Sequence, residues 1–425
     1  MKLSLVGRWS MALFASLALG LGMTACGGGT IGYMWVLGQQ YNQIAGFKVD
    51  DYSGNLTQIP GSPFASNGAV PVSLVIKSGG RYVYVINQGT CPVAGCGTGT
   101  NIGQSIALYS VGGDGTLTFQ QSYVSQGYVS EWAQMDASGT YLYVLDKYSP
   151  GLNASSGLYN AANTDGNGAI TTFVADANTG RLTLVTNSQT QKSGVNTPFW
   201  EVGPSPIMSK SLGSCLYTVN SGTTNGTQSI TPFSIGTGGQ LVFTTTGNII
   251  ISSTTSKPTN ITSINGSVGL VFLTDAANNV LYGYATTGTC GLSALNGGTT
   301  ANIPGTSDPV YSIIDSTGKY LFVLNNSTTS TLITTPFSSI SAFFISPINQ
   351  ELQPITGAPY TVGSGPVCVA EDPSNQYIYT SNRNDGTVTG KALNATTGEL
   401  SDLSKGSTFT ATGLPSCLAI SGSID

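Results

Sequence analysis

Two carboxylates and two indoles offer the most specific chemistry in this sequence. Glu131 directly precedes Trp132, and Trp200 directly precedes Glu201. A carboxylate can accept a proton from water or bind the hydroxyl groups of a ligand. The indole is a large, flat apolar surface with a polar N–H at its edge, which suits the face of a sugar ring. If the fold brings the two pairs together, they predict a site for a hydroxyl-rich ligand.

Two cations complete a candidate catalytic set. In the hydrolysis of a lactone, which is a cyclic ester, a base activates water and a cation stabilises the oxyanion that forms at the carbonyl. Glu131 or Glu201 can serve as the base, and Arg383 or Lys147 as the electrostatic support. The alternative interpretation is that these charged side chains pack at a rim and face solvent without binding a ligand.

Composition excludes several other function classes. The 425 residues include no histidine, which excludes histidine bases, histidine triads and histidine metal ligands. Only 8% of the residues are charged and the net charge is −5, with no basic stripe, so nucleic acid is not an expected partner. The chain has no phosphate-binding Gly-Lys-Ser/Thr loop, no Gly-x-Ser-x-Gly motif and no Cys-x-x-Cys motif. We therefore expect no cofactor and no metal.

One repeat organises most of the chain. An aromatic, β-branched run, typical of a strand, ends at an asparagine that lies sixteen positions after a proline. Repeats tens of residues apart indicate a radial or stacked architecture. The four pairs are Pro71 and Asn87, Pro204 and Asn220, Pro309 and Asn325, and Pro366 and Asn382.

The repeats predict an all-β propeller. Each can be divided into four strands, separated by turns rich in Gly, Asp and Asn. Seven aromatic strands begin near residues 33, 82, 141, 216, 271, 320 and 377. We predict one seven-bladed β-propeller of four-stranded antiparallel blades over residues 31–425. The C-terminal strand from Pro415 is expected to complete the first blade and close the ring. A count of six or eight stays open, because the fifth repeat is the weakest.

The polar residue that ends each aromatic strand has two interpretations. It can belong to a rim around a ligand, or it can cap its own loop by bonding the backbone two residues further on. We favour the cap, because a residue repeated in nearly every blade is more readily a structural requirement. The third repeat departs from the pattern at Ser130 and Asp146, and we expect the function to lie there. The ligand-rim candidates are Trp132, Trp200, Asp146, Asn87, Asn220 and Asn382.

The N-terminus predicts export and lipid anchoring. Residues 1–25 combine a positive flank with a short apolar run, as a signal peptide does. The segment before Cys26 resembles a bacterial lipobox, so Cys26 is expected to carry lipid and residues 26–30 to form a Gly-rich tether. Gly27 favours the outer membrane. The membrane would then be a partner, and the compartment the cell envelope. The alternative is ordinary signal cleavage beside an incidental cysteine.

Six further cysteines, an even number, suit disulfides in an oxidising compartment. One pair shares a short loop, one pair occupies equivalent positions in adjacent repeats, and one pair remains. Sequence alone leaves the connectivity open, and free buried thiols are the alternative. The three pairs are Cys91 and Cys96, Cys368 and Cys417, and Cys215 and Cys290.

The repeat units resemble the lactonase family of seven-bladed propellers, which includes the propeller-type 6-phosphogluconolactonases. The units that carry the resemblance are DASGTYLYVLD at 136–146, DSTGKYLFVLN at 315–325 and DPSNQYIYTSN at 372–382, with ANTGRLTL at 177–184. The resemblance covers nearly all of the chain after residue 25 and implies an enzyme that opens sugar lactones. Members typically carry histidines near the heads of the inner strands. Because this chain has none, no catalytic residue is carried over.

Two functions from different classes follow. The first is a lactonase-like hydrolase of the cell envelope, which rests on the resemblance. The second is a non-catalytic propeller that binds carbohydrate or a protein partner at its channel rim, which the missing histidines and scarce arginines favour. In either case we expect a monomer.

Overall fold

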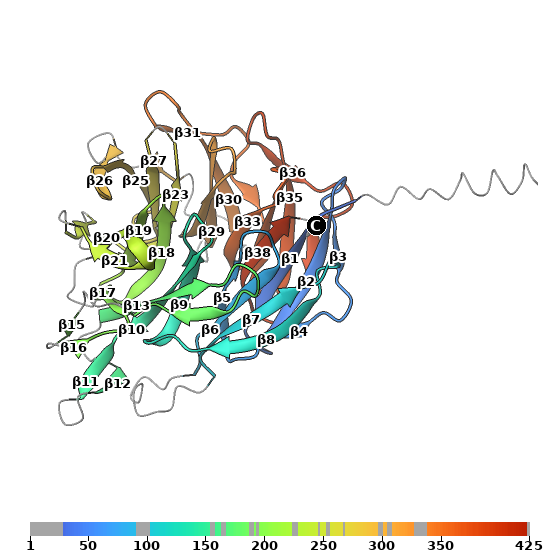
Figure 1. Ribbon diagram of the computed structural model, residues 1–425. Coiled ribbons are helices and arrows are strands. Elements are labelled where there is room, and N and C mark those ends of the chain that lie inside the picture. Colours follow the sequence, from blue (N-terminus) through green and yellow to red (C-terminus); the bar gives the residue numbers. More distant parts are fainter. Residues whose placement is uncertain are drawn as a thin grey trace, which may run out of the picture.

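The described residues of the computed structural model form seven antiparallel sheets arranged around a common axis, together with two small hairpins (Figure 1). Each of the seven sheets is one blade, so the predicted all-β propeller and its count of seven blades are confirmed. The described residues are 29–90, 103–153, 158–162, 167–186, 191–192, 195–222, 228–244, 247–251, 256–266, 268–295, 301–303, 308–326 and 338–422.

The inner strands form a closed ring around the central channel, because each contacts the inner strands of the two neighbouring blades. From the second blade to the seventh, and then the first, they are β5 (Pro71–Ile76), β9 (Tyr128–Met135), β18 (Pro206–Leu212), β23 (Pro258–Ile264), β28 (Pro309–Ile314), β33 (Pro366–Glu371) and β38 (Pro415–Gly422).

The second strands are the aromatic runs of the repeat. A blade is covered on both faces by its neighbours, so these strands are largely buried rather than alternating between buried and exposed residues; all six residues of β24 are buried. The second strands are β1 (Thr30–Gly38), β6 (Tyr82–Asn87), β10 (Tyr141–Tyr148), β19 (Cys215–Asn220), β24 (Leu270–Asp275), β29 (Tyr320–Asn326) and β34 (Tyr377–Asn382).

Every blade has the predicted third and fourth strands in its outer half. The third strands are β2 (Gln43–Asp50), β7 (Ser105–Val111), β13 (Asn167–Ala175), β20 (Ser229–Ile235), β25 (Val280–Thr287), β30 (Ser338–Ile345) and β35 (Thr387–Leu393). The fourth are β3 (Leu56–Gln58), β8 (Leu117–Tyr123), β14 (Leu182–Leu184), β21 (Leu241–Phe243), β26 (Gly291–Ala294), β31 (Leu352–Pro354) and β36 (Leu400–Asp402).

Six of the blades add a fifth, short strand that pairs with the third strand in the described part of the chain. These are β4 (Phe64–Ala65), β17 (Trp200–Pro204), β22 (Ile249–Ile250), β27 (Ala301–Asn302), β32 (Tyr360–Thr361) and β37 (Thr408–Thr410). The hairpins are β11 (Pro150–Asn153) with β12 (Leu158–Ala162), and β15 (Gln191–Lys192) with β16 (Val195–Asn196); a 3-10 turn, η1 (Thr237–Gly239), precedes β21.

The two ends of the propeller meet in the first blade. Strand β38 pairs antiparallel with β1, with Trp35 opposite Ala419, and the two lie side by side in Figure 1. The predicted closure by the C-terminal strand is therefore confirmed. Trp35 is fully buried in the cluster that joins the first, second and seventh blades, so closure buries a large apolar side chain as well as pairing the strand edge.

The register explains the proline–asparagine repeat and corrects one copy of it. Pro71 lies opposite Asn87, where an inner strand begins and a second strand ends, and the sixth and seventh blades repeat this pairing. In the fourth blade, however, Asn220 pairs with Pro206 and not with Pro204. Pro204 ends the outer strand β17, and the chain turns into β18 through Ser205, whose φ is +50°.

Candidate functional site

A cavity of about 240 Å³ opens where the inner strands begin, and all seven blades contribute to its wall. We call it the mouth cavity. Gln39 and Arg383 reach it from loops that follow second strands, and the remaining wall comes from the starts of the inner strands. Its size suits a small molecule rather than a polymer chain.

A β-bulge at the start of each inner strand shapes the cavity. In the third blade, Ser130 pairs with Asp146 and Trp132 with Leu145, which leaves Glu131 between them as the extra residue. Bulges bend a strand and redirect side chains, and they are frequent beside binding sites. We call the seven residues at this position the mouth ring: Val72, Glu131, Ile207, Thr259, Val310, Val367 and Ser416.

Glu131 is the one charged member of the mouth ring. The six other members line the mouth cavity and are uncharged. Glu131 itself is half-buried, and burial raises the pKa of its carboxyl group, with attraction by Lys147 acting in the opposite direction. Lys147 extends from the adjacent strand β10, with its Nζ 5.8 Å from the ring centre of Tyr148. The structure therefore brings together two of the predicted catalytic candidates, Glu131 and Lys147.

Arg383 supplies the positive charge of the cavity wall. It follows Asn382 at the end of β34, and its backbone N–H donates to the carbonyl of Gly365 at 2.8 Å. Its Nη1 donates to Oε1 of Gln39 at 2.6 Å, so the seventh and first blades hold the guanidinium jointly. The other guanidinium N–H groups of an arginine leave capacity for a carboxylate or a carbonyl oxygen.

An aromatic pair forms part of the cavity wall. The rings of Trp132 and Tyr311 have centroids 6.1 Å apart at an interplanar angle of 53°. The Nε1–H of Trp132 is buried and has no hydrogen-bond partner among the described residues. An orphaned donor of this kind is costly unless a ligand or water satisfies it. Trp132 therefore lies where the sequence placed it, at the rim of the channel.

Trp200 and Glu201 do not belong to this site. Trp200 is fully buried between the third and fourth blades, and its Nε1–H donates to the carbonyl of Leu241 at 2.5 Å. Glu201 lies on the outer strand β17, separated from the inner strand β9 by β10 and β13, and accepts a hydrogen bond from Ser149 Oγ at 3.1 Å. The predicted convergence of both Trp–Glu pairs at one rim was wrong, because residues 200–204 extend the outer edge of the blade.

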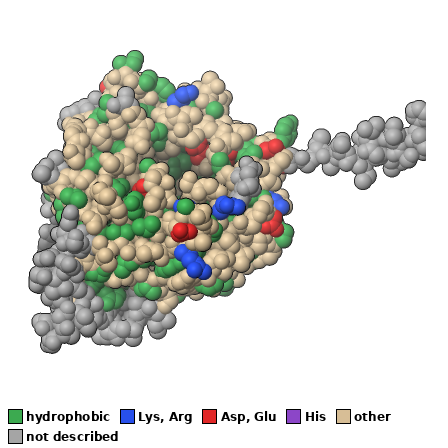
Figure 2. Space-filling view, viewed as in Figure 1, with side chains coloured by type: hydrophobic (Ala, Val, Ile, Leu, Met, Phe, Trp, Pro, Cys, Tyr) green, Lys and Arg blue, Asp and Glu red, His purple; other side chains and the backbone are tan. Residues whose placement is uncertain are grey.

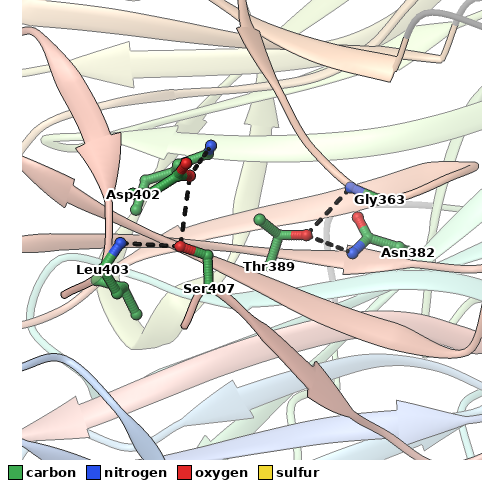
Figure 3. Close-up of polar contacts among 7 residues, drawn as sticks. Gly363, Asn382, Thr389, Asp402, Leu403 and Ser407 are labelled. Carbon is green, nitrogen blue, oxygen red and sulfur yellow. Dashed lines mark hydrogen bonds and ion pairs between the residues drawn. The ribbon is translucent and has the colours of Figure 1, made fainter. Parts of the chain in front are cut away.

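The repeated asparagines are fully buried and offer no surface to a ligand. Instead they hold the third strand of their own blade. Asn382 donates from Nδ2 to Thr389 Oγ1 at 2.9 Å, and the same hydroxyl accepts the N–H of Gly363 at 3.1 Å (Figure 3). Asn87 bonds Ser105 and Asn220 bonds Thr231 in the same way. The asparagine side chains therefore form neither the predicted ligand rim nor the predicted loop cap. They join the second and third strands of a blade by hydrogen bonds.

Asp146 and Asp275 take the place of this asparagine in the third and fifth blades, and their hydrogen bonds differ. Asp146 is fully buried and accepts hydrogen bonds from Ser125 and Ser130, both at 2.7 Å, and from the Gly127 amide at 3.1 Å. Burial nevertheless raises the pKa of Asp146 to about 6. Asp275 accepts the Ala277 N–H at 2.9 Å, so it is the residue that makes the predicted cap two residues on. Neither aspartate reaches the mouth cavity.

One predicted disulfide is present. Cys215 and Cys290 are bonded and join the fourth and fifth blades. Cys368 and Cys417 are buried thiols in the cavity wall. Cys26, Cys91 and Cys96 lie outside the described residues.

Charged side chains do not gather into a patch on the face of the molecule that Figure 2 shows. Figure 2 shows one face of the molecule, on which the few charged side chains are scattered among uncharged ones. Among the residues that the structure describes, no group of three or more His, Cys, Asp or Glu side chains is placed to hold a metal ion. Over the same ranges, no helix has the length and apolar character needed to cross a membrane.

Sequence reasoning missed the mouth ring as a set, and with it Gln39 and Tyr311. A signal for it was present, because six ring members directly follow the proline that opens an inner strand: Val72, Ile207, Thr259, Val310, Val367 and Ser416. Comparing the residues one place after each repeat proline, and adding Glu131 after Ser130, shows that a single position in the ring is charged.

The fold is a seven-bladed propeller with a small cavity at one end of its channel. Among solved structures of similar fold are a periplasmic gluconolactonase of Pseudomonas aeruginosa and a candidate 6-phosphogluconolactonase of Bacteroides fragilis. The first has a TM-score of 0.65 at 16% identity, covering 93% of this chain and 100% of the other. The second has a TM-score of 0.67 at 15% identity, covering 92% and 98%. No family model matches the sequence, and no curated protein does.

Proposed function

We propose that this protein is a lactonase-like propeller that hydrolyses a sugar lactone at its mouth cavity. The observation that carries the proposal is the mouth ring: its six uncharged members line the cavity together with Arg383, and its one carboxylate, Glu131, lies at the edge of that cavity beside Trp132. Water activation and oxyanion stabilisation need one base and one cation at minimum. The ring and its neighbouring loop supply this minimal set.

In the proposed reaction Glu131 accepts a proton from water as the oxygen attacks the lactone carbonyl. Arg383, with Lys147 as the second candidate, stabilises the negative charge on the carbonyl oxygen. The bond to the ring oxygen then breaks, and the leaving oxygen takes the proton from Glu131. The product is an open-chain hydroxy acid, and Glu131 returns to its ionised form. Trp132 packs against the apolar face of the sugar.

The cavity favours a substrate without phosphate. Arg383 is the one charged residue among those that line it, and its Nη1 is already bonded to Gln39. A phosphate carries up to two negative charges and is usually bound by several charged donors. A neutral lactone that opens to a monocarboxylate needs a single cation. The periplasmic gluconolactonase among the similar structures supports the same substrate class.

We also propose that the protein works outside the cytoplasm, exported by residues 1–25 and anchored by lipid on Cys26. The Cys215–Cys290 disulfide supports this, because disulfides persist in oxidising compartments. Mass spectrometry of the membrane-extracted protein tests it. A diacylated N-terminal Cys26 is expected, and an unmodified cysteine at that position contradicts the proposal.

The second candidate function is binding without catalysis, of carbohydrate or of a protein partner. The observation that favours it is the cavity wall itself, where the described residues contribute no carboxylate. In that case Glu131 would bind a ligand hydroxyl from the edge of the cavity rather than activate water.

A lactone panel separates the two functions. The purified protein is mixed with five- and six-membered aldonolactones, and acid release is followed above the rate in buffer alone. Binding of each product acid is measured by calorimetry on the same preparation. Hydrolysis above the buffer rate supports the enzyme. Binding without hydrolysis favours the second function, and the absence of both overturns the assignment of the mouth cavity as a sugar-lactone site.

A further inference from the structure

Two thiols meet in the wall of the mouth cavity. Cys368 and Cys417 each lie two residues after the proline that opens an inner strand, on β33 and β38. Both are buried, and both line the cavity. Their Sγ atoms are 2.7 Å apart, which is within about 0.7 Å of the disulfide bond length of about 2.05 Å. The two sulfur atoms therefore need to move only slightly to form a disulfide bond.

The surroundings of Cys368 favour the reactive form of its thiol. The Leu418 N–H points to Cys368 Sγ at 3.4 Å, and Tyr311 lines the same cavity wall. Burial disfavours the Cys368 thiolate, but the hydrogen bonds from Cys417 and Leu418, together with the Tyr311 side chain, outweigh burial and lower the pKa of this thiol. The thiolate is the form that attacks a disulfide.

The position of the pair gives its oxidation a structural consequence. Strands β33 and β38 are neighbours in the inner ring but belong to different sheets, so no strand pairing joins them. Strand β38 is the segment that closes the propeller, and it is held by pairing with β1. A bond between Cys368 and Cys417 would tie this closing strand covalently to the seventh blade.

We propose that Cys368 and Cys417 form a redox-active dithiol that closes reversibly to a disulfide in the cavity wall. The Cys368 thiolate attacks a small-molecule disulfide that enters the cavity, whose own S–S bond breaks and releases one thiolate. Cys417 then loses its proton and attacks Cys368 Sγ, which releases the second thiolate. The dithiol loses two electrons and two protons, and the oxidant takes them up as two thiols. Cys215–Cys290, already bonded between the fourth and fifth blades, has the structural role instead.

Thiol mapping on the full-length protein tests the proposal. Samples are equilibrated with oxidised or reduced glutathione, free thiols are trapped with N-ethylmaleimide, and the digests are mapped by mass spectrometry. We expect a Cys368–Cys417 linked peptide in the oxidised sample and two alkylated cysteines in the reduced one. The Cys215–Cys290 linkage should persist in both. Alkylation of both Cys368 and Cys417 after oxidation, or linkage of either to another cysteine, overturns the proposal.

Tryptophan fluorescence gives a second readout in solution. Trp132 packs on Tyr311, and both rings line the same cavity wall as Cys368 and Cys417, so oxidation should change the emission of Trp132. The change should be lost in Cys368→Ser and in Trp132→Phe, and kept in the Cys215→Ser, Cys290→Ser control. An identical change in Cys368→Ser contradicts the proposal. If that variant does not fold, the mapping of the wild-type protein still decides.

Discussion

Trp132 and Tyr311 come from the third and sixth blades, yet their ring centroids lie 6.1 Å apart. Each directly follows a member of the mouth ring, Glu131 and Val310 respectively. The contact therefore spans the channel and gives the mouth cavity an aromatic wall beside its one ring carboxylate. Because Cys368 and Cys417 line the same cavity wall as these two rings, the contact lies between the proposed ligand site and the proposed redox pair.

Truncating Trp132 should weaken ligand binding more than it weakens the fold. Trp132→Ala removes an aromatic face worth about 1 kcal/mol, so the affinity for a sugar acid should fall roughly five- to tenfold, measured by calorimetry. Trp132→Phe should retain most of the affinity for the sugar acid. Trp200→Phe is the matched control, since Trp200 is buried away from the cavity; it should lower the unfolding free energy and leave affinity unchanged. Equal affinity in Trp132→Ala and wild type would remove Trp132 from the site.

The different positions of Trp132 and Trp200 could not be predicted from the sequence. Both precede or follow a glutamate, and both lie near the start of a repeat. Strand pairing distinguishes them: Trp132 lies on the inner strand β9 and pairs with Leu145 on β10, whereas Trp200 lies on an outer strand and pairs with Ile170 on β13. Nothing local in the sequence distinguishes an inner strand from a short outer one, because both are apolar and extended.

The fold was predictable because its signals are local and repeated. Turn residues and aromatic runs recur along the chain. The C-terminal strand from Pro415 was left over after the seventh repeat, and the first repeat lacked an inner strand, so the two could be matched. The buried asparagines were harder. Their partners, such as Ser105 for Asn87, lie on the next strand across a loop of variable length, and a repeat period cannot reveal a contact of that kind.

Arg383 should control affinity for the acid product. A hydrogen bond to a charged group contributes about 1.5–3 kcal/mol, so Arg383→Gln should weaken binding of an aldonate roughly 10- to 100-fold in a calorimetric titration. Arg181 is exposed and lies outside the cavity wall, which makes Arg181→Gln the charge-matched control. Similar losses in both variants would indicate a long-range charge effect and contradict a direct role for Arg383.

Asp146 should make stability fall as pH rises. Burial raises its pKa in the folded protein from 3.8 to about 6, so the folded state binds the proton more tightly than the unfolded state does. The stabilisation of the folded state by protonated Asp146 is complete below about pH 4 and is lost as pH rises through about 6. Asp146→Asn should remove this loss and raise the unfolding free energy at pH 7 by about 1–3 kcal/mol, measured by denaturant unfolding.

Asp275 is the matched control for that experiment. Burial acts against its ionised form, but hydrogen bonds from the Lys257 amide and from Asn278 prevail and lower its pKa. Asp275→Asn should therefore destabilise the protein at pH 7, the opposite of Asp146→Asn. A shift of the same sign in both variants would contradict the assignment of these two aspartates to different environments.

Reduction of Cys215–Cys290 should cost the propeller stability without changing the mouth cavity. The bond links residues 75 positions apart, and losing a native disulfide typically costs about 2–5 kcal/mol. The Cys215→Ser, Cys290→Ser variant should show that loss in denaturant unfolding, while ligand affinity at low temperature stays within twofold of wild type. A variant as stable as the wild type would show that the strands alone hold the fourth and fifth blades together.

The proposed base predicts a pH profile. Glu131 acts as a base only when ionised, and burial raises its pKa above the usual 4.5. The rate of lactone hydrolysis should therefore increase with pH through a midpoint higher than that of an ordinary glutamate. Initial rates between pH 4 and 8, corrected for hydrolysis in buffer, give this midpoint.

The most direct measurement compares kcat/KM for lactone hydrolysis in Glu131→Gln and Glu201→Gln. Both changes remove one carboxylate from the third blade, but Glu131 belongs to the mouth ring and Glu201 to the outer strand. We predict a loss of about 10²- to 10⁴-fold for Glu131→Gln, with product binding retained, and little change for Glu201→Gln. Equal rates in Glu131→Gln and wild type would contradict the account.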